Sequence, residues 1–247
     1  MGRPVGKLGP HACRFAYCMK QITLDIGLAT GPTLENFFPG PNLAVSSHLK
    51  LWLGAESAAP ALRSPVPTYL WGSHGSGKTH LLKAVREALR EQGGVAGWLD
   101  AATLEPPDYD ETWVAVLMDD VHLYTAVQQH AAFSWFVNAQ SLQKAVLAAG
   151  DVPPADLQLR DDLRSRFGWG HVFGLKVLSE PERRAVLRQA ADARGVFLGD
   201  EVMDFMLTRF SRDLGSLMEL LDLLDGYSLQ TKRAITVPLI KSMMDNQ

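Results

Sequence analysis

The stretch from Gly72 to Thr79 reads Gly-Ser-His-Gly-Ser-Gly-Lys-Thr, a complete match to the phosphate-binding pattern G-x-x-x-x-G-K-[ST]. An apolar run at 69–71 precedes it, and apolar residues at helical spacing follow it until Gly93. A strand, a glycine loop and a helix therefore follow one another in the order that the motif needs. The alternative is a chance glycine loop, and this context argues against it.

The residue types in this loop suit a nucleotide and its metal ion. Backbone N–H groups of a glycine-rich turn at a helix N-terminus bind phosphate oxygens. Lys78 adds a point charge for the terminal phosphates, and Thr79 offers a hydroxyl to Mg²⁺. The sequence therefore predicts a site for ATP or ADP with Mg²⁺. The residues expected to contact the nucleotide are Gly72, Gly75, Ser76, Gly77, Lys78 and Thr79.

A pair of acids, Asp119 and Asp120, directly follows the apolar run at 114–118. A buried parallel strand delivers side chains to its carboxyl end, where ligands bind in open α/β sheets. We expect Asp119 to hold Mg²⁺, usually through water, and Asp120 to orient or deprotonate an attacking water. The alternative is a pair of acids that caps the next helix.

Asp151 comes just after a second buried run, at 145–149, and before Pro153-Pro154. If this strand adjoins the first one, a polar group at its end lies beside the γ-phosphate. The alternative is an ordinary turn residue. The residues leave both open.

Two arginines stand out among the charged residues. Arg166 lies in a charged segment, 159–170, that precedes an apolar run, and a solvated face is the default interpretation. The alternative is an arginine finger that reaches the nucleotide of a neighbouring molecule. Arg212 follows Ser211, a good N-cap, so it occupies a first helical turn where a cation is unfavourable. It is either a nucleotide contact or a surface arginine.

The order of elements predicts an α/β fold with a small helical domain at the end. Five apolar runs, at 69–71, 95–99, 113–118, 144–149 and 171–175, alternate with helical stretches, which is typical of a parallel sheet covered on both faces. From Glu180 onward the period changes, and every stretch predicts a helix. These helices are expected at 180–194, 200–210, 213–229 and 237–244, and an earlier one at about 42–53.

Composition excludes several classes of protein. With 247 residues and 47% hydrophobic residues, the chain is long enough for a sizeable core. No apolar run approaches the about 20 residues of a membrane span, so we expect no membrane role. The net charge is −3, although residues 1–20 carry four basic side chains and no acid. The acidic remainder disfavours duplex DNA as the main partner.

The first 20 residues hold both cysteines, Cys13 and Cys18, and lack the uninterrupted apolar core of a secretory signal. This pattern predicts a cytoplasmic protein without a disulfide framework. We expect residues 1–20 to form a disordered basic leader, with Met19 as a possible true start.

Taken together, these motifs resemble the AAA+ domain of the bacterial replication initiator DnaA over about residues 30–245. The resemblance implies a P-loop core with a five-stranded parallel sheet and a small C-terminal helical lid. It also implies a role for each matching residue. Asp119 and Asp120 are then the Walker B acids, Asp151 the first sensor, Arg166 the arginine finger and Arg212 the second sensor. Asn36-Phe37 resembles the segment near the adenine base.

The chain also differs from DnaA, because it stops at Gln247 without a helix-turn-helix domain and lacks the N-terminal helicase-interaction domain. In this it resembles the Hda family of DnaA regulatory inactivators. Members of that family begin with a peptide that binds the β sliding clamp of DNA polymerase III, and residues 21–26 are similar to it. An extended peptide inserts apolar side chains into a pocket and anchors by hydrogen bonds. The matching residues are Gln21, Leu24 and Ile26.

The resemblance implies a negative regulator of replication initiation. Holding ADP or ATP and docked on the clamp, it meets ATP-bound DnaA and promotes hydrolysis of that ATP, while touching DNA only through the clamp. Its AAA+ faces pair head to tail, so a homo-oligomer is also open. We expect a stimulator of DnaA rather than an efficient ATPase. The expected parts are the leader at 1–20, the clamp peptide at 21–26, the AAA+ domain at 27–178 and the lid at 179–247.

Two other functions stay open at this point. Lys78, Asp119 and Asp120 are compatible with a self-contained ATPase, such as a helicase loader or a DNA-remodelling ATPase. A small-molecule P-loop kinase needs an arginine-rich lid and an acceptor pocket, and the segment around Arg166 fits this poorly.

Overall fold

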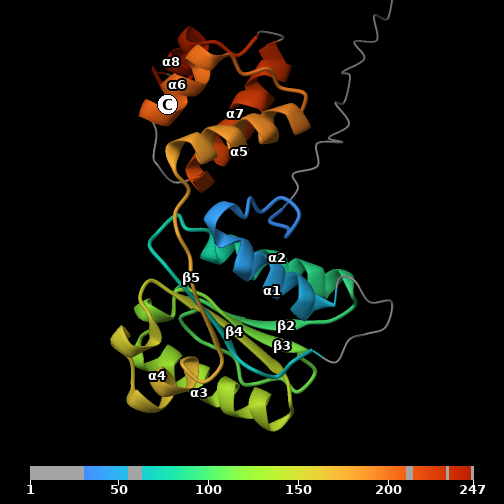
Figure 1. Ribbon diagram of the computed structural model, residues 1–247, viewed down its shortest axis with the longest axis vertical. Helices are drawn as coiled ribbons and strands as arrows, with labels where there is room; N and C mark the ends of the chain where they lie inside the picture. Colours follow the sequence, from blue (N-terminus) through green and yellow to red (C-terminus); the bar gives the residue numbers. More distant parts are fainter. Residues whose placement is uncertain (1–30, 55–62, 210–213, 232–233, 246–247) are drawn as a thin grey trace, which may run out of the picture. The chain divides into compact units, whose positions relative to one another are not determined.

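The computed structural model describes residues 31–54, 63–209, 214–231 and 234–245. These belong to one unit of the chain, Gly31–Gln247 (Figure 1). The strands are β1 (Thr68–Trp71), β2 (Ala96–Leu99), β3 (Ala115–Met118), β4 (Ala145–Gly150) and β5 (His171–Gly174). The α-helices are α1 (Leu43–Leu53), α2 (Lys78–Glu91), α3 (Ala126–Ser141), α4 (Asp161–Phe167), α5 (Glu180–Ala193), α6 (Asp200–Arg209), α7 (Leu214–Thr231) and α8 (Val237–Asp245). Short 3₁₀ turns occur at Gly40–Asn42 (η1), Val121–Leu123 (η2) and Pro154–Asp156 (η3).

The five strands form one parallel sheet in the order β2-β3-β4-β1-β5. Strand β4 therefore lies between β1 and β3. The register pairs Trp71 with Gly150 and Met118 with Ala148. The carboxyl ends of these strands consequently meet at one edge of the sheet, where the glycine loop and the acid pair begin.

The sheet is covered by helices on both faces (Figure 1). Because successive strand residues point to opposite faces, each central strand contributes to two apolar layers. In β1, for example, Leu70 packs with α1 and α2, whereas Tyr69 packs with α3 and α4. Burial on both faces explains why the central strands are continuous apolar runs rather than alternating ones.

The helices after Ser179 form an apolar cluster of their own. Helix α5 begins at a capping box, in which the backbone N–H and hydroxyl of Ser179 meet the carboxylate of Glu182. The cluster combines buried residues of α5 to α8, including Leu187, Met206, Leu221 and Ile240. Their sequences differ from those of the strand-rich part before them because Leu, Met and Ile recur at helical spacing.

The predicted α/β class with five parallel strands is confirmed. Each expected apolar run overlaps one strand, and each expected helix is present in the ranges that the structure describes. The leader at 1–20 and the peptide at 21–26 lie outside those ranges, and the domain boundaries stay predictions. Within the described ranges, no helix is both long and apolar enough to cross a membrane.

Candidate functional site

The glycine loop connects β1 to α2 and depends on left-handed backbone. Gly75 has a φ of 76° and Gly77 a φ of 98°, values that residues with a Cβ rarely adopt. Gly77 is the N-cap of α2, and no described side chain caps this helix end. The first N–H groups of α2 are therefore exposed to an anion rather than used internally.

Two of the loop glycines are also required by close packing. A Cβ on Gly77 would lie 2.8 Å from the ring of Phe37, and one on Gly72 would lie 2.4 Å from the carbonyl oxygen of Leu175. Both distances are too short for a real side chain. Phe37 also contacts the ring of His80, whose Nε2 lies 3.1 Å from the carbonyl oxygen of Thr33. The segment before α1 thus packs directly on the loop.

Lys78 is buried and points back into the loop. Its Nζ donates to the carbonyl oxygens of Gly72 at 2.6 Å and Ser73 at 3.3 Å. The hydroxyl oxygen of Ser76 is buried and has no hydrogen-bond partner among the described residues. A buried cation beside an unpartnered polar atom and a bare helix N-terminus form a donor set that suits phosphate. The residues present therefore fit a nucleotide.

Asp119 lies next to this set at the end of β3, with 3% of its surface exposed. Burial raises the pKa of its carboxyl above the ordinary value, and the nearby Asp120 charge adds to this. Hydrogen bonding from the Thr79 hydroxyl and the charge of Lys78 act in the opposite direction on the same pKa. Hydroxyl and carboxylate oxygens are the kind of ligand that Mg²⁺ prefers, and here they lie next to each other. Thr79 and Asp119, the two residues predicted to hold Mg²⁺, are therefore neighbours in the structure.

Asp120 differs from Asp119 in its backbone conformation. Its backbone is left-handed, with a φ of 49°, although it is not a glycine. Its N–H donates to Oδ1 of Asp119 at 3.1 Å. Asp120 leads into η2 rather than capping α3, because Thr125 is the N-cap of that helix. The alternative of a helix-capping acid pair is thus wrong for α3, while the catalytic role of Asp120 stays a prediction.

Asp151 follows β4, and β4 does adjoin β1, as its candidate role as a sensor requires. The N–H of Gly72 donates to the carbonyl oxygen of Gly150 at 3.3 Å, which ties the loop to this strand end. Oδ1 of Asp151 lies 2.8 Å from Nδ1 of His122, without hydrogen-bonding geometry. His122 was not predicted from the sequence. The sheet order therefore places Asp151 between the glycine loop and the acid pair along this edge.

The arginines of the segment 159–170 differ in their partners. Arg160 pairs with Asp162, and Arg164 pairs with Asp161, each at 2.7 Å. Among the described residues, no carboxylate forms an ion pair with Arg166. The guanidinium of Arg166 lies over aromatic rings instead. These rings belong to Phe133, Phe136 and Trp169.

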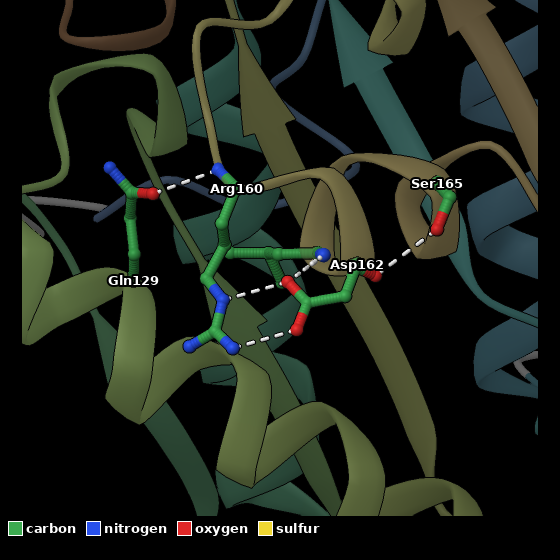
Figure 2. A network of polar contacts seen from close by, with 5 residues as sticks. Gln129, Arg160, Asp162 and Ser165 are labelled. Atoms are coloured by element: carbon green, nitrogen blue, oxygen red, sulfur yellow. Dashed lines mark hydrogen bonds and ion pairs between the residues drawn. The ribbon is translucent and has the colours of Figure 1, made fainter.

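A polar network fixes the start of α4, the helix that carries Arg166 (Figure 2). The backbone N–H of Arg160 donates to the side chain of Gln129 in α3, at 3.0 Å. The guanidinium of Arg160 donates to both oxygens of Asp162, and the Ser165 hydroxyl donates to the Asp162 carbonyl. Helix α4 is therefore anchored to α3 at its first turn.

Asn36 makes its contacts within its own turn. Its side chain accepts from the N–H of Thr33 at 2.9 Å and donates to the carbonyl of Gly31 at 3.0 Å. Its predicted place near the base stays a prediction, and it is Phe37 that contacts the loop. The predicted nucleotide contact Arg212 and the clamp residues Gln21, Leu24 and Ile26 lie outside the described residues.

Sequence reasoning missed several residues that the structure brings to these sites. Phe133 belongs to α3, and nothing in its spacing indicates that it lies beside Arg166. Asp100 follows β2 as Asp119 follows β3, and the same pattern of an apolar run ending in an acid signals it. Its carboxylate accepts from Trp98 and Thr103, which holds the loop after β2.

Comparison with known proteins shows where this architecture recurs. Residues 180–244 match the family described as Hda, lid domain. An uncharacterized protein of Haemophilus influenzae is 33% identical over 238 residues, which covers 92% of this chain and 99% of that protein.

Solved structures share the fold at lower sequence identity. Domain III of the replication initiation protein DnaA from Thermotoga maritima has a TM-score of 0.68 at 22% identity, covering 87% of this chain and 95% of that one. AMPPCP-bound DnaA from Aquifex aeolicus has a TM-score of 0.60 at 24% identity, covering 81% of this chain and 68% of that one. The RuvB Holliday junction branch migration motor of T. maritima has a TM-score of 0.59 at 18% identity, covering 87% and 71%. The sheet, the lid match and the close relative together show that the chain belongs to the Hda- and DnaA-like AAA+ proteins.

Proposed function

We propose that the chain is a DnaA-related regulator of replication that holds ATP or ADP with Mg²⁺ in its own glycine loop. The N–H groups from Gly72 to Thr79 and the ammonium of Lys78 bind the phosphates, and Thr79 and Asp119 hold the metal ion. Support comes from the buried Lys78, the unpartnered Ser76 hydroxyl and the bare N-terminus of α2. DnaA of A. aeolicus, a neighbour in fold, is bound to AMPPCP. When bound, the nucleotide would supply the negative phosphate charge that these N–H groups and the ammonium of Lys78 bind.

We further propose that the regulator promotes hydrolysis of ATP bound to DnaA. The observation that carries this proposal is Arg166, which lies beside paired arginines and yet forms no ion pair within the described chain. A planar, permanently charged guanidinium stabilises the charge that develops on a transferring phosphoryl group. In a head-to-tail pair, Arg166 would face the ATP of the neighbouring molecule while that molecule orients the attacking water. The lid match to Hda supports DnaA as that neighbour.

The remaining parts of the proposal concern assembly. Residues Gln21, Leu24 and Ile26 would dock on the β sliding clamp, so the protein would reach DNA only indirectly. Arg212 and Asp151 would sense the chain's own nucleotide, and Asn36 would lie near its base. Head-to-tail contacts are heterologous, so the same faces permit pairing with DnaA or with a second copy. Such a regulator would act in the cytoplasm.

The test is the rate of ATP hydrolysis by DnaA in the presence of this protein, ADP and clamps loaded on DNA. The parent should raise this rate, and Arg166→Ala should leave it at the value for DnaA alone. Arg164→Ala is the matched control, because Arg164 lies on the same helix but is neutralised by Asp161. The proposal fails if the parent leaves the DnaA rate unchanged or if Arg166→Ala stimulates as well as the parent.

One observation favours a second candidate function. The chain retains Lys78, Asp119 and Asp120, and the structure brings the first two together. A self-contained ATPase, such as a helicase loader or a DNA-remodelling ATPase, needs the same groups. ATP turnover by the purified protein that DNA stimulates without any clamp would favour this candidate. ATP turnover that stays slow with DNA would favour the regulator.

A further inference from the structure

Arg166 is held by aromatic faces rather than by acids. Its guanidinium carbon lies 4.7 Å from the ring centroid of Trp169, 5.0 Å from that of Phe133 and 5.7 Å from that of Phe136. Each of these distances is within the range of a cation–π interaction. Such a contact restricts where the guanidinium lies but uses none of its N–H donors. A carboxylate partner would occupy two donors and cancel the charge.

The three rings are not equivalent. Phe136 is fully buried and belongs to the core between the sheet and α3. Phe133 is shared, because the guanidinium of Arg160 also lies over it, at 4.8 Å. Trp169 is 62% exposed, and Arg166 is the one cation over its ring in the described chain. Trp169 is therefore the ring whose packing the core does not explain.

Its position in the chain supports a role that acts through Arg166. The backbone N–H of Trp169 donates to the carbonyl oxygen of Arg166 at 3.1 Å, so the turn that ends α4 fixes one residue relative to the other. The ring of Trp169 also meets Phe136 edge to face, which orients the indole on the surface. The exposed indole is thereby supported by its contact with Phe136, and its face lies against the guanidinium of Arg166.

We infer that Trp169 is a positioning residue for Arg166, holding the charged guanidinium at the surface with its donors free for the phosphate of another molecule. The inference rests on the proposed function of Arg166 as an arginine finger. Trp169 itself is not expected to contact the nucleotide. Its effect is on where the guanidinium lies before the partner arrives.

The test compares Trp169→Leu, which removes the ring face but keeps an apolar side chain, with Trp169→Phe, which keeps a ring. Phe197→Leu is the control for loss of an exposed aromatic residue, because Phe197 is 86% exposed and lies before α6. Two quantities are measured for each variant with DnaA, ADP and loaded clamps. They are the maximal rate of DnaA ATP hydrolysis and the protein concentration that gives half of that maximum.

We expect Trp169→Leu to lower the maximal rate at least about three-fold, the scale of one exposed cation–π contact, while the half-maximal concentration changes little. Trp169→Phe should restore most of the rate, and Phe197→Leu should match the parent. If Trp169→Leu raises only the half-maximal concentration, Trp169 is an interface contact and the inference is wrong.

A second readout does not depend on DnaA. In the isolated protein, the Nε–Hε resonance of Arg166, assigned by its loss in Arg166→Lys, should be shifted upfield by the ring. In Trp169→Leu it should move toward the position of a free arginine, and in Phe197→Leu it should not. A resonance that stays unchanged in Trp169→Leu overturns the inference. If the parent fails to stimulate DnaA, the proposed function is wrong, and this resonance alone decides whether Trp169 holds Arg166.

Discussion

Lys78 and Arg166 are two cations in opposite surroundings. Lys78 is buried, and carbonyl oxygens of its own loop accept hydrogen bonds from its ammonium. Arg166 is only partly buried, and aromatic faces hold it without taking its donors. Phosphate oxygens could accept the hydrogen bonds that the carbonyl oxygens now accept from Lys78, whereas the donors of Arg166 are free for an acceptor from another molecule. This difference is the one expected if, as proposed above, Lys78 serves the chain's own nucleotide and Arg166 serves that of another molecule.

The two regions also differ in what fixes them. The glycine loop is held by the backbone, through left-handed glycines and close contacts with Phe37 and Leu175. The arginine segment is held by side chains, through ion pairs and ring contacts. Backbone packing tolerates almost no substitution, while exposed ion pairs and ring contacts are individually weak. Substitutions in the loop should therefore have larger effects than those in the segment.

The largest expected effect is that of Lys78→Ala on nucleotide binding. Removing one partner of a buried, charge-assisted contact costs about 2–5 kcal/mol, so the affinity for a fluorescent ADP analogue should fall by more than about ten-fold. Lys83→Ala, on the exposed side of the same helix, should bind as the parent does. Equal loss in both variants would mean that general charge, not the position of Lys78, drives binding. Fluorescence titration measures both.

The second-largest expected effect is a loss of stability in Gly77→Ala. Both the left-handed φ and the approach of Phe37 oppose a Cβ, so the free energy of unfolding in urea should fall by about 1–3 kcal/mol. Gly93→Ala is the matched control, because its φ is +77° but nothing lies within 4 Å of its Cβ position. The difference between the two variants isolates the contact with Phe37. If they lose the same stability, backbone strain alone explains the need for glycine.

Asp119→Asn should raise stability and lower function. Burial raises the pKa of Asp119 in the folded state, so the folded protein holds this proton to a higher pH than the unfolded chain does. Above both pKa values the buried charge therefore lowers the free energy of unfolding. This cost shrinks as pH falls below the raised pKa and is gone below the pKa of the unfolded chain. At neutral pH the variant should unfold at higher urea than the parent, with less dependence on pH.

The same variant should lose the gain in nucleotide affinity that Mg²⁺ gives, because an amide is a weaker ligand than a carboxylate. Titration with and without Mg²⁺ measures this gain. Asp120→Asn should raise stability less, since Asp120 is only partly buried and Asn tolerates left-handed backbone. The gain that it does give comes from removing the charge beside Asp119. If Asp119→Asn destabilises the protein, the contact with Thr79 outweighs the cost of burial.

The smallest expected effect is that of Asp162→Ala. This change removes the exposed pair with Arg160 and the anchor of the first turn of α4 (Figure 2). The free energy of unfolding should fall by less than about 1 kcal/mol. Stimulation of DnaA should fall slightly, because Arg166 lies on the same helix. Asp161→Ala, which breaks the more exposed pair with Arg164, should change neither quantity. A loss as large as that of Arg166→Ala would place Asp162 itself in the site.

The fold was predictable because the central strands carry their signal locally. A run such as Ala145–Ala149 is apolar throughout because both of its faces are buried, and it ends where Gly150 and Asp151 begin. The sheet order was not predictable from these runs. That β4 adjoins β1, which brings Asp151 near the glycine loop, depends on pairing between residues far apart in the chain.

The site divides in the same way. Lys78 and Thr79 follow from a motif with fixed spacing, and Asp119 follows from an apolar run that ends in acids; the structure brings the three together. The rings around Arg166 could not be predicted in this way, since Phe133 is on another helix and aromatic residues in a helix usually indicate only a core. The contact of Phe37 with Gly77 is also tertiary, although Phe37 follows the Asn36 that the sequence singles out.

Lys78 and Arg166 are proposed to act on different nucleotides. The most direct test is the dissociation constant of a fluorescent ADP analogue for Arg166→Ala, measured beside the ability of the same preparation to stimulate DnaA. We expect Arg166→Ala to bind the analogue with an affinity within about two-fold of the parent, far below the ten-fold step of 1.4 kcal/mol, and to give no stimulation. An Arg166→Ala variant that loses affinity for its own nucleotide in parallel with its stimulation of DnaA would show that Arg166 acts on the same nucleotide as Lys78.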